Sequence, residues 1–142
     1  MKVRVLLVDD EEQFVQTLAM RLDTRGYAVA TAFNGDQALK YLKAKEADVV
    51  ILDVLMPGLT GIDTLREMKK LRPLTEIIML TGHATVETAI EGMKLGAFDF
   101  LMKPTEIEDL VEKIDKAYRR KAEHEDRIRQ ATIDKIAKTR GF

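Results

Sequence analysis

The chain has 142 residues, of which 46% are hydrophobic and 33% are charged, and its formal net charge is −1. That length fits one domain of ordinary size, and the apolar content excludes a disordered chain. The small net charge gives no basic field for nucleic acid or membrane, and the absence of cysteine excludes disulfides, thiolate metal sites and cysteine nucleophiles. No apolar stretch approaches the ~20 residues that a membrane span requires, so we expect a cytoplasmic protein without membrane contact.

Short apolar runs alternate with helical patterns along the chain. The predicted strands are Val3–Val8, Tyr27–Phe33, Asp48–Val54, Glu76–Thr81 and Phe98–Lys103. Helical periodicity fills the intervals, as in the stripe of Phe14, Leu18 and Leu22, and a fifth helix is predicted to begin at Thr105. Such alternation predicts an α/β fold, a doubly wound five-stranded parallel sheet with helices on both faces.

The end of the chain differs from the rest in composition. Residues 119–142 contain eight Lys or Arg and four Asp or Glu. We therefore expect a globular domain over residues 1–120 and a helical extension or linker over residues 121–142.

The fifth helix is predicted to continue into this extension. One set of positions, Ile107, Ile114, Lys121 and Ile128, recurs every seven residues, and so does a second set, Leu110, Ala117, His124 and Ala131. This spacing is typical of a coiled-coil seam. Two alternatives stay open, a helix that pairs with a second copy of the chain and a solvated helix that frays.

Polar residues end four of the predicted strands. Asp9 and Asp10 follow the first strand, Asp53 ends the third, Thr81 ends the fourth and Lys103 ends the fifth. In the strand order 2-1-3-4-5, the first and third strands are neighbours at the point where the order reverses, which is where such sheets bind ligands. Three carboxylates, a hydroxyl and an ammonium would then converge in one crevice.

This set of groups favours phosphoryl transfer. Carboxylates at short range repel one another, and a hard divalent cation removes the conflict. An all-oxygen site suits Mg²⁺, with Mn²⁺ as an alternative, better than Zn²⁺. The cation would bring in a phosphate donor and leave Asp53 as the attacking carboxylate. Lys103 would neutralise charge, and Thr81 would donate a hydrogen bond to a phosphoryl oxygen.

Four short motifs carry a family resemblance. They are "VDDEE" with Asp9 and Asp10, "ILDVLMPGLTG" with Asp53, "TGHA" with Thr81 and "MKP" with Lys103. Together they resemble the response-regulator receiver domain, the CheY-like fold, over about residues 1–120. The segment "TGHATVETAIEGMKLGAFDFLMKP" further resembles receivers of the NtrC-like branch, which regulate AAA+ transcription activators.

The resemblance implies a phosphoacceptor domain of a two-component system, which catalyses only its own phosphorylation and dephosphorylation. A sensor histidine kinase would phosphorylate Asp53 in a Mg²⁺-dependent reaction. Asp10, Asp53 and the backbone carbonyl of Leu55 would bind Mg²⁺, and Asp9 would act on the metal through water.

The resemblance also implies a switch. Thr81 and Lys103 would contact the phosphoryl group, and Phe100 would turn inward as Thr81 moves. The Lys103–Pro104 peptide bond would be cis, an isomer accessible mainly before proline. The face formed by the fourth helix, fifth strand and fifth helix would change, to control a transcription-regulating effector. A homodimer would form through this face or through the C-terminal helix, without direct binding of nucleic acid by this chain.

Two other classes are alternatives to this interpretation. A Mg²⁺-dependent phosphatase with an aspartate nucleophile would need a D-x-D motif after the first strand, whereas Asp9 and Asp10 are adjacent. A flavodoxin-like FMN protein would need a phosphate-binding loop there, and the acidic "DDEEQ" would repel a phosphate.

Overall fold

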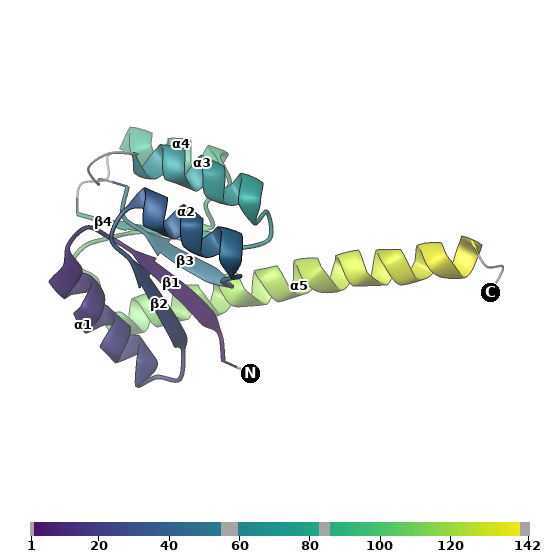
Figure 1. Ribbon diagram of the computed structural model, residues 1–142, viewed down its shortest axis with the longest axis horizontal. Helices are drawn as coiled ribbons and strands as arrows, with labels where there is room; N and C mark the ends of the chain where they lie inside the picture. Colours follow the sequence, from purple (N-terminus) through teal and green to yellow (C-terminus); the bar gives the residue numbers. More distant parts are fainter. Residues whose placement is uncertain (1, 55–59, 83–85, 140–142) are drawn as a thin grey trace.

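The computed structural model describes residues 2–54, 60–82 and 86–139. The elements in chain order are β1 (Arg4–Val8), α1 (Glu12–Asp23), β2 (Ala28–Ala32), α2 (Gly35–Ala44), β3 (Val49–Leu52), α3 (Gly61–Leu71), β4 (Glu76–Thr81), α4 (Val86–Lys94), β5 (Asp99–Met102) and α5 (Ile107–Thr139). The strands form one parallel sheet in the order β2-β1-β3-β4-β5 (Figure 1), which confirms the predicted topology.

Two apolar layers cover the sheet. Leu6, Val50 and Ile77 point to one face and pack with residues of α2 and α3, whereas neighbours such as Leu7 and Ile51 point to the other face and pack with α1 and α5. Figure 1 shows α2, α3 and α4 together on one side and α1 with α5 on the other. The central strands β3 and β4 are buried along their whole length, as parallel strands covered on both faces should be.

Helix α5 is much longer than the other helices and projects from the body (Figure 1), as the predicted extension required. It begins at Ile107, two residues after the predicted start at Thr105. The carbonyl of Glu106 accepts hydrogen bonds from the backbone N–H groups of Asp109 and Leu110, so the helical hydrogen-bond ladder starts there. Within the described residues, no helix is long and apolar enough to cross a membrane.

The heptad pattern in α5 has a different cause over its first half from the one predicted. Its apolar positions there are buried within this chain and cover the sheet; they are Ile107, Leu110, Ile114 and Ala117. These positions are therefore not available to a second copy. Beyond them the helix leaves the body, and Ile128, Ile133 and Ile136 are exposed.

Lys121, which occupies a position of the predicted seam, is buried and anchors the helix where it leaves the sheet. Its Nζ lies 3.1 Å from Asp48 Oδ1 and 3.2 Å from Glu125 Oε2. Asp48 also accepts hydrogen bonds from the backbone and the guanidinium of Arg4. Burial alone would raise the pKa of Asp48, but the bonds from Arg4 and Lys121 outweigh it and hold that pKa below its ordinary value of 3.8.

Asp48→Asn should lower the free energy of unfolding by about 3 to 5 kcal/mol near neutral pH, because it removes the buried anion of Lys121 and leaves this lysine only the partly exposed Glu125. A carboxylate with a lowered folded-state pKa stabilises the fold above its unfolded pKa, and this contribution is lost as the pH falls through the folded value. Urea unfolding should therefore show the difference between variant and wild type shrinking below about pH 4.

A matched control is Asp126→Asn, which removes an exposed ion pair with Arg129 at 2.7 Å. Exposed pairs contribute less than about 1 kcal/mol, so this variant should stay close to wild type. An Asp48→Asn variant as stable as this control would contradict the anchoring role.

Candidate functional site

The backbone ladder brings the predicted carboxylates together. The N–H of Asp53 donates to the carbonyl of Val8 at 2.9 Å, and the N–H of Asp9 donates to the carbonyl of Ala32 at 3.2 Å. Both residues therefore extend the ladder by one bond beyond the last strand residue. Since β1 and β3 are adjacent and parallel, Asp9 and Asp53 lie side by side at the carboxyl edge of the sheet.

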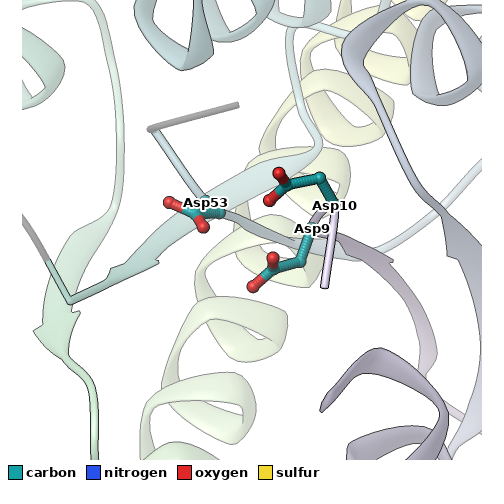
Figure 2. Close-up of side chains that lie close together, drawn as sticks. All are labelled: Asp9, Asp10 and Asp53. Atoms are coloured by element: carbon teal, nitrogen blue, oxygen red, sulfur yellow. The ribbon is translucent and has the colours of Figure 1, made fainter. Parts of the chain in front are cut away.

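Asp9, Asp10 and Asp53 form one acidic cluster (Figure 2). One carboxylate oxygen from each lies within 4.8 Å of the others. Asp9 and Asp53 are buried, whereas Asp10 is exposed at the mouth of the cluster. Hard carboxylate oxygens at this spacing fit a divalent cation such as Mg²⁺, which keeps water as further ligands. The predicted fourth ligand, the carbonyl of Leu55, lies outside the described residues.

Lys103 supplies the positive charge at this edge. Its Nζ donates a hydrogen bond to Asp9 Oδ2 and lies 3.4 Å from Glu11 Oε1 and 3.5 Å from Asp53 Oδ2. Burial alone would lower the pKa of Lys103, but the bond to Asp9 and the charges of Asp53 and Glu11 raise it above its ordinary value. Lys103 therefore stays charged. Its peptide bond to Pro104 is cis, the isomer that the resemblance implied.

The predicted switch residues lie on neighbouring strands. Thr81 is fully buried at the end of β4, and its carbonyl accepts a hydrogen bond from the N–H of Lys103 at 3.0 Å. Phe100 on β5 is half-buried against the core layer of α2 and α3. It pairs with Met79, whereas Thr81 pairs with Met102, so the two predicted switch residues are offset by two positions in the register.

Gly61 returns the chain close to the end of β3. Its N–H donates to the carbonyl of Val54 at 3.1 Å, and a Cβ at this position would lie 2.1 Å from the Cα of Val54. No side chain fits such an approach, so glycine is required where the start of α3 meets the backbone of Val54. In the sequence, this glycine could be recognised only as a turn signal.

Two contacts of Lys103 were not predicted. No role was predicted for Glu11, although its carboxylate lies 3.4 Å from the ammonium. Phe14 was assigned to the apolar stripe of the first helix, yet Lys103 Nζ lies 4.2 Å from the centroid of its ring. Neither contact has a sequence signal, because each joins the N-cap or first turn of α1 to a residue about ninety positions further along the chain.

Comparison with known proteins agrees with this geometry. The family described as "Response regulator receiver domain" matches residues 5–115. The transcriptional regulatory protein ZraR of Salmonella typhimurium is 40% identical over 116 residues, which cover 82% of this chain and 26% of ZraR. A putative NtrX-like response regulator of Rickettsia felis is 40% identical over 109 residues, which cover 75% of this chain and 23% of that protein.

Solved structures give the same result. The CheY-like receiver domain protein of Methanospirillum hungatei superposes with a TM-score of 0.84 at 28% identity, covering 87% of this chain and 99% of that one. NtrX of Brucella abortus, solved in complex with ATP, superposes with a TM-score of 0.83 at 31% identity, covering 89% of this chain and 29% of that one.

The chain therefore belongs to the response regulator receiver domain family, the signalling domain of two-component response regulators. Its relatives include regulators of the NtrC-like branch, as the sequence predicted. The chain spans about a quarter of the length of ZraR.

Charge balance at the cluster predicts opposite effects of two substitutions on Mg²⁺ affinity. Lys103→Met should bind Mg²⁺ more tightly, because it removes a cation that competes for Asp9 and Asp53. Asp10→Asn should bind Mg²⁺ at least about tenfold more weakly, because it removes one of three negative charges near the ion. Isothermal titration calorimetry measures both, with the exposed Lys40→Met as a control that should match wild type. Weaker binding in Lys103→Met would contradict the proposed competition.

Proposed function

We propose that the chain is the phosphoacceptor of a two-component response regulator and that Asp53 accepts the phosphoryl group from a sensor histidine kinase. The observation that carries this proposal is the buried Asp53 carboxylate, which lies beside two further carboxylates and 3.5 Å from the ammonium of Lys103. A lone buried carboxylate would be costly, whereas this one has both a cation and a metal-binding arrangement beside it. Family membership supports the same role.

In the proposed reaction a carboxylate oxygen of Asp53 attacks the phosphorus of a phosphohistidine. The P–O bond to Asp53 forms as the P–N bond to the imidazole breaks, and the imidazole leaves with the bonding electron pair. Bound Mg²⁺, held by Asp10 and Asp53 with Asp9 acting through water, would supply charge neutralisation at the phosphoryl oxygens. Lys103 would turn from Asp9 towards the phosphoryl group, and the Thr81 hydroxyl would donate a hydrogen bond to it.

The read-out surface that we propose lies next to β5. Val86, Ile90 and Met93 of α4 and Met102 of β5 are exposed, although they are large and apolar. An open groove of about 480 Å³ runs along α4 and is bordered by Phe100. Inward movement of Phe100 would reshape this groove. A phosphoryl group on Asp53 that accepts a hydrogen bond from Thr81 would therefore change the surface offered to a partner.

We further propose that this surface controls a transcription-regulating effector. Support comes from ZraR, which is named a transcriptional regulatory protein and of which this chain spans 26%. The exposed groove along α4 is the surface on which we place a homodimer contact. The exposed isoleucines of α5 beyond Lys121 are a second candidate for that contact.

Incubation with acetyl phosphate and Mg²⁺ should add one phosphoryl group to the chain, measured as the intact mass. Asp53→Asn should abolish the addition, because the amide oxygen is a poor nucleophile. Asp63→Asn, a half-exposed carboxyl in the first turn of α3, is the control and should be labelled as wild type is. Equal labelling of Asp53→Asn would exclude Asp53 as the acceptor.

Thr81→Ala should still be phosphorylated but should show much smaller amide shifts around Phe100 and α4 on phosphorylation. A ligand shifts an equilibrium only through contacts that differ between the two states, and the bond from Thr81 to the phosphoryl group would be such a contact. Two-dimensional NMR of both proteins with and without phosphodonor measures the shifts. Shifts of wild-type size in the variant would refute the coupling through Thr81.

A further inference from the structure

Phe14 lies in the first turn of α1 and borders a small hollow together with Asp9 and Asp53, two residues of the acidic cluster in Figure 2. Lys103 Nζ lies 4.2 Å from the centroid of the Phe14 ring. An ammonium over an aromatic face is attracted by the negative charge density of the ring. The Lys103 side chain is only 15% exposed, so little water weakens this attraction.

The other contacts of Lys103 leave its position weakly defined without the ring. Among the described residues, Asp9 accepts a hydrogen bond from the ammonium, and Glu11 and Asp53 accept longer ones at 3.4 and 3.5 Å. The lysine stem has four rotatable bonds, and contacts at its charged end alone do not fix them all. When Lys103 leaves Asp9 for a phosphoryl group, the bond to Asp9 is lost as well.

A cavity beside Lys103 gives the side chain somewhere else to go. It has a volume of about 210 Å³ and lies between α1 and the start of α5, lined in part by Phe14, Leu18, Lys103 and Leu110. Phe14 also borders the small hollow next to Asp9 and Asp53. The ring therefore stands between the carboxylates and a space large enough for the lysine stem.

We propose that Phe14 is a positioning residue for phosphoryl transfer, whose ring holds the Lys103 ammonium over the acidic cluster and keeps it out of the neighbouring cavity. This inference rests on the proposed function and adds to it a residue of α1. Phe14 touches Lys103 rather than the reacting atoms, so it acts through the lysine. The ring would matter most after Lys103 has left Asp9, since the hydrogen bond to Asp9 then no longer holds the ammonium.

The test compares Phe14→Leu and Phe14→Tyr in the full chain. Acetyl phosphate with saturating Mg²⁺ is the donor, so that contacts with a kinase play no part. Phe14→Leu should lower the rate constant for phosphorylation of Asp53 by roughly threefold to tenfold, the range expected for losing one such contact. Phe14→Tyr keeps the aromatic face and should restore most of the rate.

A packing defect alone would give a different pattern. Leu18→Ala opens the same cavity from the next turn of α1 without removing the aromatic face, and it should phosphorylate at close to the wild-type rate. The ¹⁵N–¹H signal of the Lys103 ammonium should broaden or shift in Phe14→Leu and remain in Leu18→Ala. Equal slowing in both variants would assign the effect to packing and overturn the proposal.

Fluorinated phenylalanines at position 14 keep the shape of the ring and weaken its negative face stepwise, which covers the case in which Phe14→Leu fails to fold. Rates that fall with each added fluorine support the proposal, and a flat series overturns it. If wild type is phosphorylated and Phe14→Leu reacts equally fast, only the role of Phe14 fails. If wild type takes up no phosphoryl group, the proposed function fails, and this inference fails with it.

Discussion

Repulsion between carboxylates crowded at one edge of the sheet determines which other groups the site must contain. Asp9 and Asp53 are buried side by side, because adjacent parallel strands end at the same edge. Buried like charges repel each other, and a nearby cation relieves the repulsion. Lys103 is that cation, and its pKa is raised by the same carboxylates. The balance is incomplete, since one ammonium faces three aspartates and Glu11. An excess of negative charge of this kind favours the binding of a divalent cation. The bound cation would in turn attract a phosphoryl donor.

The opposite edge of the sheet solves a different charge problem. Asp48 precedes β3 and forms ion pairs with both Arg4 and Lys121. The pair with Lys121 joins the amino edge of the sheet to α5. Glu76, the first residue of β4, is also buried, and Arg120 lies 3.5 Å from it. Two successive cations on α5 thus meet two buried anions. Since the same helix covers the face of the sheet next to the site, the direction in which its exposed part projects is fixed by the receiver body.

The sequence sufficed for the features that follow from local pattern and from topology. Strand order, and with it the convergence of Asp53 with Lys103, follows from the βα alternation and from a resemblance that several motifs share. Side-chain contacts between segments far apart in the sequence could not be predicted, because no local pattern indicates them. Lys121 occupies a heptad position and looked like a defect in a seam, but its partner Asp48 lies 73 positions earlier. Phe14 looked like one member of an apolar stripe, because a ring over a distant ammonium leaves no trace in local periodicity.

The most direct test of the account is to locate the phosphoryl group by chemistry. An acyl phosphate is reduced by borohydride, so a phosphorylated aspartate becomes homoserine and an unmodified one does not. After reaction with acetyl phosphate and Mg²⁺, peptide mass spectrometry of the reduced chain should place homoserine at position 53 and leave Asp9 and Asp10 intact. Homoserine at either of these positions, or at none in a chain whose mass shows a phosphoryl group, would contradict the assignment of Asp53 as the acceptor.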